Sequence, residues 1–213
     1  MPTPQATKYL ALYEQDVIVR DNTLSLYDTF LRNMGESKTL IQIIQDLLKE
    51  KKRIRLLDIG CGNAQVLHEL KTHFGDRVHT MGVDLLPPFY PPDEFLQGDV
   101  HELPLPLECD LILSFRALHE MGNLPSLLPR IARALGKGGK AYLWVRLRVI
   151  EANSDQLEGE MTPTDEAFLE ASAPRTKWGE TFALVDPILG EFIPKSGVLQ
   201  EIARGYAIVL HRP

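Results

Sequence analysis

The sequence predicts a doubly wound α/β fold that is built on a parallel sheet. Three observations lead to this prediction. Short apolar segments alternate with segments of helical periodicity between residues 53 and 149. A glycine-rich turn joins the first apolar segment to the first helical one, and acidic residues close several of the apolar segments. Strands that alternate with helices form a parallel sheet that is covered on both faces.

The chain length and composition are those of an ordinary globular protein. With 213 residues, 44% of them hydrophobic and 24% charged, the chain is long enough for one domain with a sizeable core. We therefore expect a single domain over residues 1–213. It is divided into a helical N-terminal cap (1–50), a central α/β core (51–150) and an acidic lid segment with the final strands (151–213).

Charge and cysteine content exclude several classes of protein. The formal net charge is −6 and no basic stripe is present, so a nucleic-acid partner is not expected. Cys61 and Cys109 are the two cysteines, and neither a disulfide framework nor a metal-ligand spacing can be built from them. The first residues lack the pattern of a signal peptide and no apolar run is long enough to cross a bilayer. We expect a cytoplasmic protein without a membrane partner, and the oligomeric state stays open.

The spacing of apolar residues and the turn residues predict the individual helices and strands. Apolar residues at the spacing of amphipathic helices predict helices within residues 5–50, with Ser37 as a cap of the second segment. After residue 150 a capped helix is expected near residues 164–171, and Gly205 is expected in a turn between two final strands, although residues 196–203 could also be helical. The core is expected to contain strands at 53–58, 78–84, 94–97, 109–115 and 140–149, and helices at 63–74 and 124–135, the latter ended by the glycines of 136–139.

Acidic residues at the strand ends indicate a nucleotide site. In an open parallel sheet, ligands bind beyond the carboxyl ends of the strands, where Asp58, Asp84 and Asp99 are expected. Asp84 follows the glycine turn by about 20 residues, the distance at which an acid meets a ribose hydroxyl pair. Asp99 could accept a hydrogen bond from an adenine amine, with Leu85 and Val100 as apolar faces for the ring.

The glycine turn also discriminates between cofactors. Gly60 and Gly62 allow a tight turn and leave room for a ligand. A dinucleotide fingerprint requires a glycine at the sixth position, where Gln65 stands, and no Gly-Lys-Ser/Thr sequence is present. Asp58 would repel a pyrophosphate but suits a ligand with a positively charged amine. NAD, FAD and nucleoside triphosphates are therefore disfavoured.

Taken together, these residues resemble the class I S-adenosylmethionine-dependent methyltransferases. Ala64 departs mildly from that family, since it replaces the usual third glycine. The resemblance covers residues 54–145, in order and spacing. It consists of Leu-Leu-Asp-Ile-Gly-Cys-Gly-Asn-Ala at 56–64, Gly-Val-Asp-Leu at 82–85, Gly-Asp-Val at 98–100, Asp-Leu-Ile-Leu-Ser-Phe-Arg-Ala-Leu-His at 110–119 and Leu-Gly-Lys-Gly-Gly at 135–139.

The resemblance implies a Rossmann-like seven-stranded sheet that is mostly parallel, in which the last two strands complete the sheet and the final one is antiparallel. It also implies S-adenosylmethionine as the cofactor and assigns roles to the matching positions. Gly60, Cys61 and Gly62 would line its methionine portion. Asp58 would orient the amine, with the backbone of Ser114 near it. Asp84 would bind the ribose, and Asp99 the adenine. Arg32 could meet the methionine carboxylate as part of a lid with Tyr9, Tyr13 and Tyr27, or these residues could serve packing and surface.

The expected reaction is methyl transfer to a nitrogen, oxygen or carbon atom of a small molecule. His119 is the leading candidate for a general base, with Glu120 as a weaker one, although His119 could instead shape the acceptor pocket. No Asn/Asp-Pro-Pro-Tyr sequence follows the fourth strand, which argues against amino-methylation of nucleic-acid bases or glutamine. The alternatives are a protein or RNA methyltransferase, a regulatory module that binds the cofactor without catalysis, and a non-methylating use of the sulfonium. The acidic residues 151–170 could favour a cationic acceptor or form a solvated face.

Overall fold

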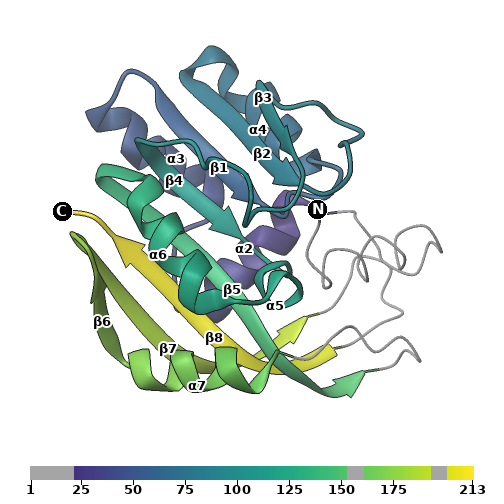
Figure 1. Cartoon of the computed structure of the whole chain (residues 1–213). Helices are drawn as coiled ribbons and strands as arrows, with labels where there is room; N and C mark the ends of the chain where they lie inside the picture. Colours follow the sequence, from purple (N-terminus) through teal and green to yellow (C-terminus); the bar gives the residue numbers. More distant parts are fainter. Residues whose placement is uncertain (1–21, 153–160, 193–200) are drawn as a thin grey trace.

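One mixed sheet organises the protein. The structure is a computed structural model that describes residues 22–152, 161–192 and 201–213. Within these residues the sheet has eight strands in the order β3-β2-β1-β4-β5-β8-β7-β6 (Figure 1). The strands are β1 (Ile54–Ile59), β2 (Val78–Asp84), β3 (Glu94–Gln97), β4 (Cys109–Ser114), β5 (Leu135–Ala152), β6 (Arg175–Trp178), β7 (Thr181–Phe192) and β8 (Glu201–His211).

The strand directions confirm the predicted topology. Strands β1 to β5 pair in parallel, β8 is antiparallel to β5 and β7, and β6 is antiparallel to β7. The chain goes outward from β1 to β3 and then returns to the other side of β1 with β4. The order therefore reverses between β1 and β4, which is where ligands bind in sheets of this kind.

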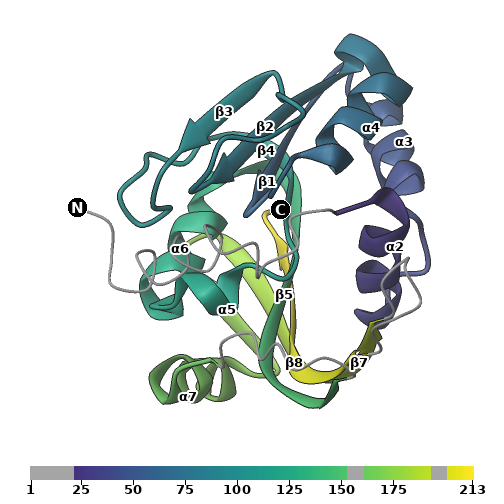
Figure 2. The same cartoon turned by 90° about the vertical axis from the view of Figure 1, so that its right-hand side faces the viewer.

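Helices cover both faces of the sheet, as Figure 2 shows. One face carries α2, α3 and α4, and the other carries α5, α6 and α7. Each face has its own buried apolar cluster, with Phe30, Leu67 and Trp144 in the first and Ile59, Leu128 and Val145 in the second. The helices are α2 (Leu24–Asn33), α3 (Leu40–Glu50), α4 (Gln65–Phe74), α5 (Leu118–Met121), α6 (Leu124–Ala134) and α7 (Pro163–Ser172), with a 3-10 turn, η1, at Gly75–Arg77.

The sheet has one strand more than the seven predicted. Residues 175–192 form a hairpin of two strands that were not predicted, and the two predicted final strands are one strand, β8. β6 pairs with the first residues of β7, from Trp178↔Thr181 to Arg175↔Leu184. β7 contains Pro187 and Gly190, which are uncommon inside strands and conceal the strand in the sequence. Pairing along β8 holds these residues in the sheet.

The expected turn at Gly205 was wrong. β8 is continuous from Glu201 to His211, and Gly205 lies inside it opposite Arg146. A Cβ at Gly205 would lie 2.3 Å from the carbonyl oxygen of Val145 and 2.7 Å from the ring of Trp144. Close packing against β5 therefore requires a glycine at this position, and the helix considered for residues 196–203 is excluded for 201–203, the part that is described.

Two further boundaries differ from the expectation. The N-cap of α3 is Thr39 rather than Ser37, because Thr39 and Gln42 form a reciprocal capping box. The helix α6 ends at Ala134, and the glycines of 136–139 already belong to β5. Leu135 pairs with Cys109 before a register shift in the β4–β5 ladder, so the segment after α6 enters the sheet directly.

Candidate functional site

The turn between β1 and α4 is held from two sides. The N–H groups of Gly60 and Cys61 donate to the carbonyl oxygen of Val83 on β2, at 2.8 and 3.2 Å. Gly60 has a φ of +76°, and a Cβ there would lie 2.2 Å from the Cβ of Ala117. The close approach of α5 thus requires a glycine at this position, in addition to its backbone conformation.

Ala64, which stands where the resemblance would place a glycine, has a left-handed backbone conformation. Its φ is 57°, in the left-handed region, and the residue is fully buried at the N-terminus of α4. A non-glycine residue in this conformation costs about 1 kcal/mol. The alanine is therefore accommodated at a cost in backbone energy.

Asp84 supports the turn from the end of β2. Its Oδ2 accepts a hydrogen bond from the N–H of Gly62 at 2.8 Å, and its Oδ1 accepts one from Leu86 at 3.2 Å. The residue is 7% exposed, and Leu85 beside it is half-buried. Each carboxylate oxygen has a second lone pair, so Asp84 can hold the turn and still accept from a ligand hydroxyl.

Asp99 begins a second turn at the same edge of the sheet. Its Oδ1 accepts from the N–H of His101 at 2.9 Å. Arg130 of α6 donates to the carbonyl oxygens of Val100, His101 and Leu103, at 2.9, 3.0 and 2.6 Å. This arginine fixes the turn, and it escaped the sequence analysis because nothing in the pattern of α6 distinguishes it from a surface residue.

Asp58 is the most unusual acid of the site. It is 1% exposed, and its Oδ2 accepts a hydrogen bond from the hydroxyl of Tyr27 at 2.7 Å. Its Oδ1 is buried with no hydrogen-bond partner in the described part of the chain. Burial raises the pKa of Asp58 to about 7; the Tyr27 hydroxyl lowers that pKa, and the negative charge of Asp84 raises it further. A cationic donor at Oδ1 would satisfy the oxygen and neutralise the charge, so the site fits an ammonium group.

Ser114 and Arg32 differ in their relation to this turn. Ser114 is fully buried at the end of β4, and its hydroxyl donates to the carbonyl oxygen of Ile59 at 2.7 Å. Its backbone therefore lies beside the start of the turn. Arg32 is exposed in the last turn of α2, away from the buried face that carries Tyr27 and Leu31. The structure does not bring Arg32 together with the other predicted residues.

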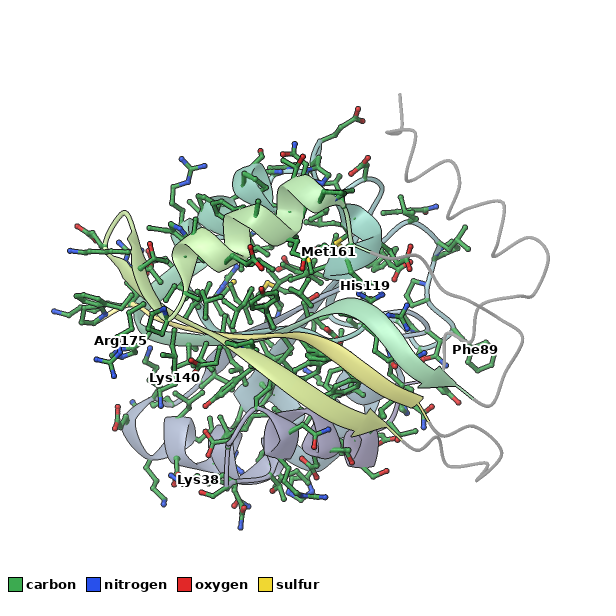
Figure 3. All side chains as sticks on the ribbon, turned by 90° about the horizontal axis from the view of Figure 1, so that it is seen from below. Lys38, Phe89, His119, Lys140, Met161 and Arg175 are labelled. Atoms are coloured by element: carbon green, nitrogen blue, oxygen red, sulfur yellow. The ribbon has the colours of Figure 1, made fainter. Side chains whose placement is uncertain are left out.

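His119 and Glu120 lie on α5, next to the turn. His119 is 2% exposed, and its Nε2 is 3.5 Å from Oε1 of Glu120. The same Oε1 is 3.8 Å from the guanidinium of Arg146, which is also 2% exposed. Arg146 lies three residues beyond Leu143, the last β5 residue paired with β4, and therefore beyond the carboxyl end of β4. Figure 3 shows His119 on the α7 side of the sheet, with Met161 on the same side.

The surroundings of His119 oppose its protonation. Burial lowers its pKa well below the usual value, and the positive charges of Arg146 and Arg116 lower it further. A general base works best when its pKa is near the operating pH. The lowered pKa therefore makes His119 a poor proton acceptor, and Arg146 is the neighbour that the sequence analysis missed.

Other predicted features lie apart from this site or outside the described residues. Tyr9 and Tyr13 lie outside them, as do residues 153–160 of the acidic stretch. Within that stretch, Asp165 is 2% exposed and accepts from the N–H of Leu124 at 2.6 Å, so this acid caps α6. The described residues contain no group of three or more His, Cys, Asp or Glu side chains that could hold a metal ion. None of the described helices combines the length and apolarity needed to cross a membrane.

Comparisons with known proteins point to one family. A family model described as a methyltransferase domain matches residues 30–179, more than half of the chain. No curated protein matches the chain in sequence.

Solved structures share the fold at low sequence identity. The 1,6-didemethyltoxoflavin-N1-methyltransferase of Burkholderia thailandensis, solved with 1,6-didemethyltoxoflavin and S-adenosylhomocysteine bound, is 16% identical, with a TM-score of 0.52 over 97% of this chain and 86% of that one. A TehB-like SAM-dependent methyltransferase of Corynebacterium glutamicum is 14% identical, with a TM-score of 0.45 over 98% of each chain.

Proposed function

The chain belongs to the methyltransferase-domain family and is a class I S-adenosylmethionine-dependent methyltransferase, and from this premise we propose that its acceptor is a small molecule. The methyl group would pass to a nitrogen, oxygen or carbon atom of that acceptor. The cofactor supplies a sulfonium-bound methyl group that is already activated. The contribution required of the protein is therefore alignment of donor and acceptor, with a proton acceptor only where the chemistry demands one.

The cofactor site that we propose uses the acids at the strand ends. Asp58 accepts from the ammonium through Oδ1, which is supported by the burial of that oxygen without a partner. Asp84 accepts from the ribose hydroxyls while it holds the N–H of Gly62. Asp99 accepts from the adenine amine. The remaining contacts are proposed for Gly60, Cys61 and Gly62 along the methionine portion, the Ser114 backbone near the amine, and Leu85 and Val100 against the adenine ring.

The observation that carries the small-molecule proposal is the burial of the region beside the turn. The side chains of His119 and Arg146 are 1% and 3% exposed, and that of Glu120 is 13% exposed. A folded protein or an RNA helix needs an exposed reacting edge, whereas a small acceptor can enter an enclosed one. The net charge of −6 also disfavours RNA. The heterocycle bound to the Burkholderia protein of the same fold is a small acceptor of this kind.

His119 is proposed to line the acceptor side of this region, next to Glu120. Its neutral imidazole can accept or donate one hydrogen bond to an acceptor without carrying charge. The pKa of His119 lies well below its usual value, which supports a role in shaping and orienting rather than in proton removal.

The test is to incubate the protein with methyl-labelled S-adenosylmethionine and a cell extract separated into small-molecule, protein and RNA fractions. We expect label in the small-molecule fraction and none with the Asp84→Ala variant. Label confined to protein or RNA would overturn the small-molecule proposal in favour of a macromolecular acceptor. An absence of label in all fractions would contradict it as well.

A further inference from the structure

We propose that Tyr27 is a positioning residue for the amine of the cofactor, because it occupies one oxygen of Asp58 and directs the ammonium to the other. The inference rests on the proposed cofactor site. It concerns a residue of α2, a helix that precedes the sheet and contributes none of the strand-end acids.

The contact joins two side chains with almost no exposure. Tyr27 is 0% exposed and Asp58 is 1% exposed, and the hydroxyl donates to Oδ2 at 2.7 Å. Asp58 therefore keeps one buried oxygen, Oδ1, without a partner in the described residues. An ammonium would satisfy Oδ1, the oxygen that lacks a partner, so the hydrogen bond from Tyr27 to Oδ2 favours one orientation of the ligand.

The ring of Tyr27 is fixed by aromatic packing. Its centroid is 4.8 Å from that of Phe115 in an edge arrangement, and Phe115 is stacked on Phe30 at 5.0 Å. Phe115 directly follows Ser114 at the end of β4. The same packing that seats α2 on the sheet therefore sets the position of the hydroxyl.

The helix itself is anchored at its N-terminus. The Oγ1 of Thr23 accepts from the N–H of Leu26 at 3.3 Å, and the N–H of Leu24 donates to Glu69 of α4 at 3.3 Å. α4 is the helix that follows the glycine turn. Tyr27 is thus tied both to the turn and to the end of β4, the two segments between which the cofactor is proposed to lie.

The hydroxyl also favours the charged form of Asp58. Among the groups around this carboxyl, burial and the charge of Asp84 raise its pKa, and the hydrogen bond from Tyr27 lowers it. Burial raises the pKa of Tyr27 well above its usual value, and Asp58, Cys61 and Asp84 raise it further, so the phenol remains a donor. Removal of the hydroxyl would leave Asp58 protonated to a higher pH and would weaken its hold on an ammonium.

The experiment compares two ligands by calorimetry with wild type and Tyr27→Phe. S-adenosylhomocysteine carries the amine, and 5′-methylthioadenosine lacks the amino-acid portion. We expect Tyr27→Phe to lower the affinity for S-adenosylhomocysteine by about tenfold, the scale of one hydrogen bond to a charged group. The pH at which this affinity is lost should rise, and the affinity for 5′-methylthioadenosine should change by less than about twofold.

A matched control and a second measurement keep the test decisive. Tyr142→Phe removes a hydroxyl that donates to Glu36 at 2.8 Å in the same apolar cluster, and it should leave both affinities unchanged. In an Asp58→Asn background, Tyr27→Phe should have no further effect on S-adenosylhomocysteine. If Tyr27→Phe does not fold, the pKa of Asp58 measured by NMR in the wild type decides: a fall of more than one unit on binding S-adenosylhomocysteine, and no change with 5′-methylthioadenosine, supports the proposal.

The outcomes separate the two levels of inference. Equal losses for both ligands or unchanged affinity for both would overturn the role of Tyr27 while leaving the cofactor site intact. An unchanged pKa of Asp58 on binding S-adenosylhomocysteine would overturn the contact between Asp58 and the amine, and the role of Tyr27 with it. A wild-type protein that binds neither ligand would overturn the cofactor site itself.

Discussion

Asp58 and His119 are two buried titratable side chains at the same edge of the sheet, and their surroundings give them opposite chemistry. Both are at most 2% exposed, and burial favours the neutral form of each. Burial raises the pKa of Asp58 to about 7, and the second carboxylate, Asp84, raises it further, so the site gains from a cationic ligand. Burial lowers the pKa of His119 well below its usual value, and two guanidinium groups lower it further, so a proton there is opposed.

The two regions differ in whether a charged partner is already present. The Asp58 region has a negative charge and an oxygen without a partner in the described residues, which a ligand can complete. In the His119 region the cations of Arg146 and Arg116 are already in place, which leaves the imidazole neutral. We infer that the first region binds through charge and that the second acts through shape and neutral hydrogen bonds.

The largest effect is expected at the acid that supports the turn. Asp84→Ala should reduce the affinity for S-adenosylmethionine by more than about a hundredfold, because it removes a charged acceptor of the ribose and also frees the N–H groups of Gly62 and Leu86. Calorimetry measures the affinity. Asp76→Ala, at an aspartate whose side chain is 98% exposed, is the control. Unchanged affinity in Asp84→Ala would remove this acid from the site.

Asp58→Asn should separate binding from stability. Without the carboxylate, we expect cofactor affinity to fall by at least about tenfold. The folded pKa of about 7 exceeds the unfolded value of 3.8, so wild-type Asp58 costs stability progressively as the pH rises from about 4 to about 7. Relative to wild type, the variant should therefore gain on the order of 2 kcal/mol in the free energy of unfolding between pH 5 and pH 8. Denaturant unfolding of both proteins at the two pH values checks the sign. The prediction is contradicted if the stability of the variant relative to wild type falls from pH 5 to pH 8.

A smaller effect is expected for the imidazole. His119→Gln should lower kcat by less than about tenfold, because a side chain with so low a pKa is a poor proton acceptor and the amide keeps a neutral hydrogen-bonding group. Turnover is measured with labelled cofactor and the acceptor fraction that takes up label. A loss of about a hundredfold or more with cofactor affinity retained would instead make His119 the general base.

The smallest effect concerns the neighbour of that imidazole. Arg146→Met should raise the pKa of His119 toward its ordinary value, because it removes one of the two positive charges that oppose protonation. In the wild type the lowered pKa means that stability is lost as the pH falls below about 6.5, where the unfolded histidine takes up a proton. NMR titration of the histidine follows the shift. An unmoved pKa of His119 in Arg146→Met would assign the low value to burial and Arg116.

The sequence alone determined the class of fold and the placement of the three acids. The positions of Asp58, Asp84 and Asp99 follow from the carboxyl ends of three adjacent strands, β1, β2 and β3. The strand, glycine turn and helix at 54–74 are local patterns within a short stretch of chain. The strand β7 was missed because Pro187 and Gly190 contradict a strand pattern, and β6 is a strand of four residues that pairs with β7. Only the pairing of β7 with β8 overrides that preference.

The tertiary structure decided which side chains complete the site. Tyr27 reaches Asp58 across 31 positions of sequence, Arg130 reaches Val100 across 30, and Arg146 of β5 approaches Glu120 of α5. The sequence predicts a turn at Gly205, but a glycine is required there because the strand packs closely on Val145 and Trp144. Such contacts depend on how separate elements pack, and no local spacing encodes them. The acids of the site follow from the order of the strands, whereas their pKa values and partners follow from what folds against them.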